Sequence, residues 1–272
     1  MDVALAAFYG GCDVVLSPSE SADESLRALR IDPSKIGRWD RGVDLGRFGR
    51  HHRDGSFQGD FGERSAARSP IGRAPNEAFS VLYAGRLTKE KGVDLLADSF
   101  LAARAQDPRL HLVLAGGGPE EHVLRERLGS SATFLGWLDG PQLAWAYATA
   151  DAFLFASQTD TFGQVILEAQ ASGLPVVAVA EGGPLSLIEN GRSGLLCPAE
   201  SSALAGALLE VAGSPALRER LSDGGLLSVK GRTWAAALGR LADGYSGALG
   251  ARLSPSSSRL RVGARGAHQH AA

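Results

Sequence analysis

Short apolar runs alternate with amphipathic stretches from about Phe79 onward. Four of these runs have the length and composition of buried strands, at residues 80–84, 110–115, 152–156 and 175–180. Between the first two, apolar residues recur at helical spacing, at Val93, Leu96, Ala97, Phe100 and Leu101. This alternation predicts an α/β fold, a doubly wound parallel-sheet (Rossmann-like) domain with helices on both faces of the sheet.

Further helices are predicted at residues 119–128, 141–149, 163–172, 202–211 and 234–249. Upstream of the main domain, residues 1–10 indicate a helix, residues 13–16 a short strand and residues 20–29 another helix. A single βα unit cannot bury a sheet face by itself. We therefore interpret residues 1–40 as the remnant of a second domain whose beginning is missing.

Two stretches have no sustained periodicity. Residues 50–76 are rich in Gly, Ser, Arg and His, and residues 251–272 have a similar composition. Such compositions are typical of linkers and disordered tails. The predicted organisation is a remnant at 1–40, a linker or insertion at 41–78, a main domain at 79–249 and a disordered tail at 250–272.

Composition excludes several classes of partner. The 272 residues include 28 Lys or Arg and 30 Asp or Glu, so the net charge is −2. No overall field is available to hold a nucleic acid or an anionic membrane, and we expect no nucleic-acid partner. No apolar run approaches the roughly 18 to 20 residues of a membrane helix. Cys12 and Cys197 form no disulfide or metal pattern, which favours a reducing cytoplasm.

The first candidate cluster follows the strand at 80–84 and precedes a helix. Its sequence, GRLTKEKG at 85–92, places Arg86 and Lys91 where ligands bind in open α/β sheets, at the carboxyl ends of strands. An Arg guanidinium can donate hydrogen bonds to two phosphate oxygens at once, and Lys adds a second positive charge. A diphosphate therefore fits this arrangement. A solvated basic turn is the alternative interpretation.

A second cluster, AGGGPE at 115–120, includes Gly117 and follows the next strand. Its glycines permit close approach of a ligand or a tight βα turn. It lacks the G-x-G-x-x-G spacing of a dinucleotide-binding fingerprint, although Asp139 lies about twenty residues further on. A dinucleotide-dependent oxidoreductase would have the same predicted fold, but this sequence lacks the dinucleotide-binding fingerprint.

The third cluster, SQTDTFGQVILEA at 157–169, runs from a strand end through a loop into a helix. Asp160 lies on the loop and Glu168 lies inside the helix among apolar residues. A buried carboxylate needs hydrogen-bond donors, and vicinal ribose hydroxyls would supply two. Gly163 leaves the amides of the helix start open to a phosphate or sugar oxygen. Alternatively, Asp160 caps the helix and Glu168 pairs with a neighbouring base.

These clusters together resemble the C-terminal domain of the GT-B-fold glycosyltransferases of family 4, the glycosyl transferases group 1. The resemblance covers about residues 42–249 and includes RGVD at 41–44, GRL at 85–87, KG at 91–92, FLG at 134–136 and the stretch 159–175. Residues 6–44, with LSPS at 16–19, resemble the end of that family's N-terminal domain and its linker. Family members carry about a full further domain before the equivalent of Met1, so the resemblance implies a chain without most of its acceptor-binding half.

The resemblance implies a retaining hexosyltransferase that takes its sugar from a nucleoside diphosphate donor. Its catalytic residues would be Arg86 and Lys91, on the diphosphate, and Asp160, on the donor sugar, where the family usually has Glu. The remaining donor-binding residues would be Gly85, Gly117, Phe162, Gly163, Gln164 and Glu168, the last on the ribose. The segment 134–138 would neighbour the nucleobase.

No metal or other cofactor is expected, because no D-x-D carboxylate pair is present. The expected donor is GDP- or UDP-linked, with a slight preference for GDP-mannose, and the expected acceptor is a lipid or glycan. The expected location is cytoplasmic, with peripheral membrane contact through the missing domain left open. A non-catalytic nucleotide-sugar-binding module is the alternative to an active transferase.

Overall fold

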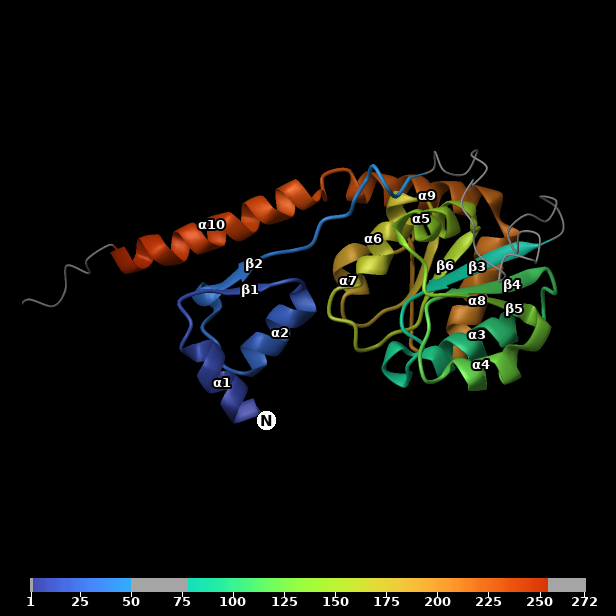
Figure 1. Ribbon diagram of the computed structural model, residues 1–272, viewed down its shortest axis with the longest axis horizontal. Helices are drawn as coiled ribbons and strands as arrows, with labels where there is room; N and C mark the ends of the chain where they lie inside the picture. The colour runs from blue at the N-terminus through green and yellow to red at the C-terminus, as the bar shows by residue number, and fades with distance from the viewer. Residues whose placement is uncertain (1, 50–77, 254–272) are drawn as a thin grey trace, which may run out of the picture.

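The computed structural model describes residues 2–49 and 78–253, which form a smaller and a larger body (Figure 1). The connecting segment, residues 39–49, leads out of the smaller body, and the last helix returns to it. The elements of the smaller body are α1 (Asp2–Gly10), β1 (Val15–Ser17), α2 (Glu20–Ala28), a 3-10 turn η1 (Pro33–Lys35), β2 (Ile36–Arg38) and α10 (Trp234–Leu253).

The larger body alternates strands and helices along the chain. Its elements are β3 (Phe79–Ala84), η4 (Lys89–Lys91), α3 (Val93–Arg104), β4 (Leu110–Ala115), α4 (Glu121–Leu128), η5 (Gly129–Ser131), β5 (Ala132–Gly136), α5 (Gly140–Thr149), β6 (Ala152–Phe155), α6 (Gln164–Ala171), β7 (Val176–Val179), α7 (Pro184–Leu187), β8 (Leu195–Cys197), α8 (Ser201–Gly213) and α9 (Pro215–Val229). All six strands are parallel, in the order β5-β4-β3-β6-β7-β8. The predicted doubly wound α/β class is confirmed.

The strand order reverses between β3 and β6. From β3 the chain moves outward through β4 to β5, then returns to place β6 on the other side of β3, with Val81 beside Ala152. The loops after β3 and β6 therefore leave in opposite directions and open a crevice at the carboxyl ends of the strands. This topology brings residues 85–92 and 157–163 to the same edge of the sheet.

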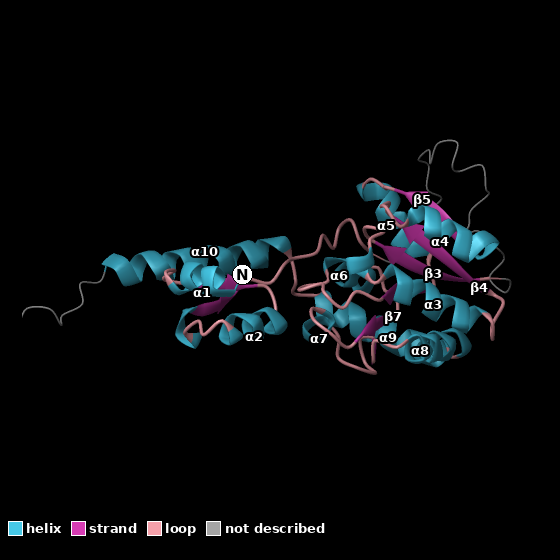
Figure 2. Ribbon diagram, turned by 90° about the horizontal axis from the view of Figure 1, so that it is seen from below, coloured by secondary structure: helices cyan, strands magenta, loops and turns pink. Residues whose placement is uncertain are grey.

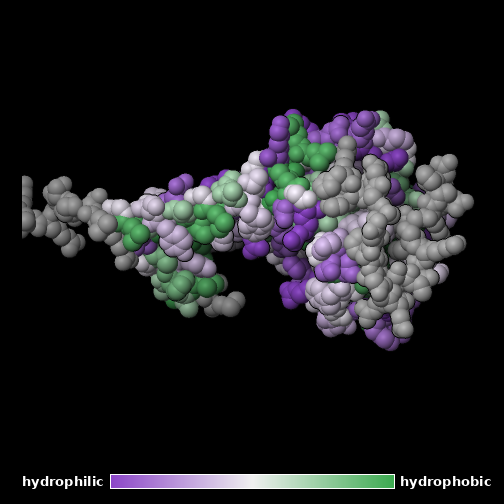
Figure 3. Space-filling view, turned by 45° about the horizontal axis from the view of Figure 1, so that its top comes forward, coloured by the Kyte–Doolittle hydropathy of each residue, from purple (hydrophilic) through white to green (hydrophobic). Residues whose placement is uncertain are grey.

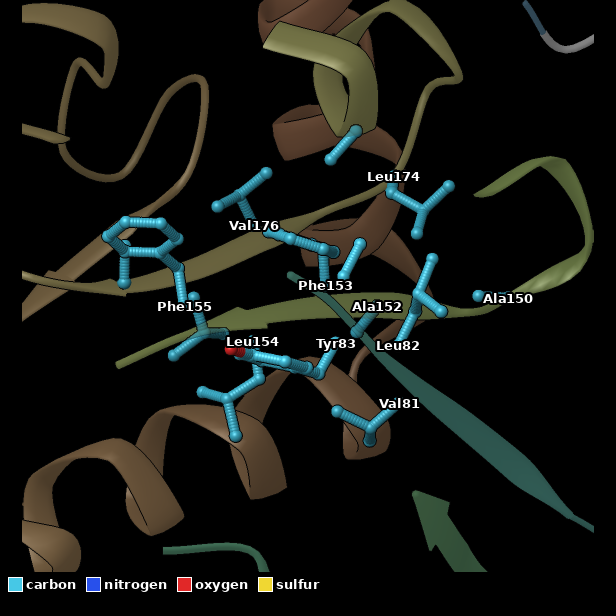
Figure 4. Packing of buried hydrophobic residues seen from close by; sticks show 14 of the residues in the cluster. Val81, Leu82, Tyr83, Ala150, Ala152, Phe153, Leu154, Phe155, Leu174 and Val176 are labelled. Atoms are coloured by element: carbon cyan, nitrogen blue, oxygen red, sulfur yellow. The ribbon is translucent and has the colours of Figure 1, made fainter. Parts of the chain in front are cut away.

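Helices cover both faces of the sheet, which explains why the central strands are continuously apolar. In Figure 1, α3, α4 and α8 lie on one side of the sheet, and α5, α6 and α9 lie on the other; Figure 2 views the molecule from below, with the helices in front of and behind the strands. Every residue of β3 and β6 is buried. Figure 4 shows Leu82, Phe153 and Val176 packed among their neighbours in this core.

The predicted strands and helices of the larger body are confirmed within about two residues at each end. The strands β5 and β8, the helices α7 and α9, and the short 3-10 turns η4 and η5 were not predicted. β5 is a partly exposed edge strand without alternation, and β8 has only three residues. α9 contains Gly224 and Gly225, which indicate a loop in sequence but here allow close packing, since a Cβ at Gly224 would lie 2.0 Å from the carbonyl oxygen of Arg192.

The smaller body differs from its prediction in its strands and in the end of its last helix. β1 lies slightly later than the predicted strand at 13–16 and pairs in parallel with β2, which was not predicted. α10 lies along this sheet, with Gly244 against the side chain of Leu16. The helix continues to Leu253, so the predicted tail at 250–272 begins too early. The predicted linker at 50–76 lies outside the described residues, as does the tail beyond 253.

Hydrophobic side chains gather on the surface of the smaller body (Figure 3). Large exposed side chains include Val3 and Phe8 on α1, and Leu238, Tyr245 and Leu249 on α10. In the described part of the chain, no helix combines the length and apolarity needed to cross a lipid bilayer.

Gly92 holds the loop after β3 close to the loop after β6. Its φ is 70°, and a Cβ added there would lie 2.1 Å from the carbonyl oxygen of Ala156. We expect Gly92→Ala to lower the free energy of unfolding by at least about 2 kcal/mol, because left-handed backbone and the backbone clash both oppose a side chain. Urea unfolding followed by circular dichroism measures this loss.

Gly206→Ala is the matched control. Gly206 lies inside α8, with nothing within 4 Å of an added Cβ. Alanine should therefore raise the free energy of unfolding by roughly 0.5–1 kcal/mol, as expected for an open helix position. A Gly92→Ala variant as stable as the parent would contradict the close approach of the two loops.

Candidate functional site

Lys91 and Asp160 meet at the switch point. Lys91 ends the η4 turn after β3, and Asp160 lies in the loop after β6. The Lys91 Nζ donates to Asp160 Oδ2 at 2.8 Å, and both side chains are about three-quarters buried. Together with Gly85 and Tyr83 they line a cavity of about 60 Å³. The structure therefore brings Lys91 and Gly85 of the first predicted cluster together with Asp160 of the third.

The second carboxylate oxygen of Asp160 caps the turn that leads into α6. Its Oδ1 accepts from the amides of Phe162, at 3.0 Å, and Gly163, at 2.8 Å. Burial acts to raise the pKa of Asp160, but the bond from Lys91 and the two amides outweigh it and hold the pKa below its usual value. These two amides precede α6, whose N-cap is Gly163 and has no side-chain cap, so Asp160 stabilises the turn before the helix instead of capping the helix itself.

Glu168 lies further along α6, in an apolar setting. The hydroxyl of Tyr147 on α5 donates to Glu168 Oε2 at 3.0 Å. Burial raises the pKa of Glu168 to about 7, against the opposing effects of the bonds from Tyr147 and Gln164 and the charge of Arg47. A carboxyl group held near this pKa needs strong hydrogen-bond donors to stay ionised, which suits a role in binding hydroxyl groups.

Two buried tyrosines connect Glu168 with Asp160. Burial raises the pKa of Tyr83, and the charge of Asp160 raises it further. Burial also raises the pKa of Tyr147, followed by the effects of Glu168 and Tyr83. Asp160 therefore lies within electrostatic range of Tyr83, Glu168 lies within range of Tyr147, and the two tyrosines lie within range of each other.

The side chain of Arg86 pairs with a different acid from that of Lys91. Its guanidinium donates to Glu90 Oε1 at 2.6 Å, and its side chain is 59% exposed. It is not among the residues that line the Lys91–Asp160 cavity. The backbone of Arg86 takes part in the packing of the site, since its carbonyl oxygen accepts from the Tyr83 hydroxyl at 2.7 Å. Its role on a diphosphate stays a prediction.

The other predicted residues occupy the rim in different ways. Gly117 lies against Trp137, where an added Cβ would be 2.9 Å from Trp137 Nε1. The ring of Phe162 is buried, with the Arg41 guanidinium 5.8 Å from its centroid. Gln164 Nε2 donates to the carbonyl oxygen of Gly42 at 3.0 Å. The binding roles assigned to these side chains stay predictions.

Sequence analysis missed three contributors to this rim. Tyr147 supplies the donor to Glu168, and Arg47 supplies a nearby positive charge. Ser19, the N-cap of α2 in the smaller body, donates to the carbonyl oxygen of Thr161 at 2.6 Å, next to Asp160. No motif marks Tyr147 or Arg47, and the LSPS stretch that ends at Ser19 does not reveal its contact with Thr161.

The sequence of this chain is similar to a family of known proteins and to several of its members. Residues 78–214 match the sequence profile of the family described as Glycosyl transferases group 1. A GDP-mannose-dependent alpha-mannosyltransferase of Mycolicibacterium smegmatis is 38% identical over 246 residues, which are 90% of this chain and 60% of that protein. A D-inositol 3-phosphate glycosyltransferase of Actinosynnema mirum is 34% identical, over 81% of this chain and 54% of that protein. The chain thus spans little more than half the length of these curated relatives.

Solved structures share the fold. Sucrose-phosphate synthase from Thermosynechococcus elongatus superposes with a TM-score of 0.74 and 26% sequence identity. The match covers 92% of this chain and 62% of that protein. The similarity therefore includes elements of the smaller body as well as the six-stranded domain.

The raised pKa of Glu168 makes stability depend on pH. An acid whose pKa is about 7 in the folded protein and 4.5 as its ordinary value opposes folding progressively as the pH rises through that window. We expect Glu168→Gln to remove this opposition. Relative to the parent, the variant should gain up to about 3 kcal/mol between pH 4.5 and 7, and nothing further above pH 7.

Urea unfolding at fixed pH values from 4.5 to 8, without nucleotide, measures this gain. Glu219→Gln is the control, since Glu219 is exposed on α9, and its stability difference from the parent should stay constant. A Glu168→Gln difference that is equally constant would show that Glu168 does not titrate near neutral pH.

Proposed function

The chain belongs to the glycosyl transferases group 1, and we propose that its larger body binds the nucleoside diphosphate part of a sugar donor, from which a hexosyl group is transferred with retained configuration. The observation that carries this proposal is the Lys91–Asp160 pair, which lines a cavity at the switch point of the sheet. Ligands of open α/β sheets bind at this point.

When a donor binds, Lys91 would leave its hydrogen bond to Asp160 and donate to the phosphate oxygens of the diphosphate instead. Both carboxylate oxygens of Asp160 are bound, one by Lys91 and the other by two amides. A diphosphate competes for the same cation and the same helix-end amides, and Asp160 is then free to accept hydroxyls of the donor sugar. Lys91 and the amides stabilise charge on the departing diphosphate, so the proposal assigns no metal.

Arg86 and Glu168 would hold the two ends of the donor's nucleoside diphosphate. Arg86 and its partner Glu90 are both more than half exposed, so rotation of the Arg86 side chain toward a phosphate costs little. Glu168 would accept the ribose hydroxyls beside Tyr147.

We assign GDP-mannose as the donor. Two of the relatives are named as GDP-mannose-dependent alpha-mannosyltransferases, at 38% and 37% identity. Trp137 is 68% exposed beside Gly117 and offers an aromatic face to a purine base. A lipid or glycan acceptor and a cytoplasmic location belong to the same proposal.

Titration calorimetry with GDP, UDP and GDP-mannose tests the donor site. We expect GDP and GDP-mannose to bind more tightly than UDP. Lys91→Ala should weaken GDP binding about tenfold to a hundredfold, the effect of removing a hydrogen bond to a charged group. Lys89→Ala, an exposed lysine on the same turn, should leave the affinity within a factor of two.

Two outcomes would overturn the proposal. Binding of NAD without binding of GDP or UDP would favour a dinucleotide-dependent enzyme. Equal affinities of the Lys91→Ala and Lys89→Ala variants would show that Lys91 does not face the phosphates. Release of GDP from GDP-mannose in the presence of lipid or glycan acceptors separates a transferase from a module that only binds the nucleotide sugar.

A further inference from the structure

The connecting segment reaches the candidate site through a short, well-packed turn at residues 44–48. Asp44 Oδ1 accepts from the amides of Gly46 and Arg47, both at 3.0 Å, and the Phe48 amide donates to the carbonyl oxygen of Asp44 at 2.8 Å. Val43 and Phe48 are buried against the larger body. These bonds fix the backbone at Arg47, whose side chain is 53% exposed.

Arg47 and Phe48, which are adjacent in this turn, both contact α5. The Phe48 ring packs edge-on against Tyr147, with centroids 5.6 Å apart. The Arg47 guanidinium rests on the first residue of α5, where Nη1 lies 2.9 Å from the position of a Cβ on Gly140. Gly140 thus makes room for Arg47, and Phe48 supports the tyrosine that binds Glu168.

Three groups face Glu168, each from a different element. Tyr147 on α5 and Gln164 on α6 act by hydrogen bonds, and Arg47 on the connecting segment acts by its charge. All three lower the pKa of Glu168 against the effect of burial. Arg47 is the cation of this set, and its other charged partner is Asp44, with the Nε and Oδ2 atoms 3.8 Å apart.

We propose that Arg47 is a positioning residue of the donor site, which keeps the Glu168 carboxylate ready to accept the ribose hydroxyls of a nucleoside diphosphate. The inference rests on the proposed function and adds to it a residue from outside the nucleotide-binding domain. An ionised carboxylate accepts two hydroxyl hydrogen bonds, whereas the neutral acid has to donate its own proton. The affinity for the donor therefore depends on the position of the connecting segment, which carries Arg47.

The test is GDP affinity measured by calorimetry between pH 6 and 9. In the parent, affinity should fall as Glu168 becomes protonated near pH 7. Arg47→Ala should move this midpoint upward by on the order of half a pH unit, which weakens binding about twofold at pH 7. Arg47→Lys should keep the midpoint near that of the parent.

Glu168→Gln provides the baseline, because GDP itself and other groups also titrate. In that background, Arg47→Ala should change neither the affinity nor its pH dependence further. A loss of the same size with and without Glu168 would overturn the inference, since Arg47 would then act directly on the ligand. A lower Tm with an unmoved midpoint would overturn it too, as a merely structural effect.

Gly140→Ala tests the geometry without removing the charge. The added methyl displaces the flexible end of Arg47, and alanine at a helix start is well tolerated. The midpoint should move upward, less than in Arg47→Ala, and Gly140→Ala should have no effect once Arg47 is alanine. NMR titration of the Glu168 carboxyl in the free protein should show the same order of pKa values.

The two proposals fail in different ways. If the parent binds no nucleoside diphosphate, the proposed function falls and the inference falls with it. If the parent binds GDP and the Arg47→Ala and Gly140→Ala variants keep its midpoint, the inference alone is wrong.

Discussion

The reversal of strand order between β3 and β6 is the constraint on which the site depends. β3 and β6 are neighbours in the sheet, and the chain leaves them toward opposite edges of the sheet. Lys91, which follows β3, and Asp160, which follows β6, therefore meet although they are 69 residues apart in sequence. Gly92 permits the required approach of the two loops. Without that topology, the basic and acidic clusters would be unrelated surface turns.

Electrostatics then divides the rim into two environments. Asp160 has a cation and two amides, and its pKa is lowered, so it stays ionised. Glu168 is buried with weaker support, and burial raises its pKa to about 7. Two acids on one rim thus differ in the charge they carry near neutral pH. Such a difference is typical of sites in which similar groups have distinct roles.

The main domain was largely predictable because its central strands are buried on both faces and its loops carry glycine and charge at strand ends. The position of both loops at the carboxyl ends of strands was also predicted, whereas the ion pair between Lys91 and Asp160 was not. Tyr147 and Arg47 were not predictable, because the hydrogen bond of Tyr147 and the charge of Arg47 act on Glu168 through tertiary packing rather than through spacing in sequence. The edge strands and α9 were missed since short exposed strands and glycine pairs have no distinctive pattern.

The smaller body takes part in holding this rim. Ser19 at the start of α2 binds the carbonyl oxygen of Thr161, and the next amide, of Glu20, donates to Ser186 Oγ at 3.2 Å. The connecting segment adds a third contact, since Gly42 accepts from Gln164 on the helix that carries Glu168. Each contact ends on or beside a loop or helix of the candidate site. A change in the relative position of the two bodies therefore cannot leave the surroundings of Asp160 and Glu168 unaltered.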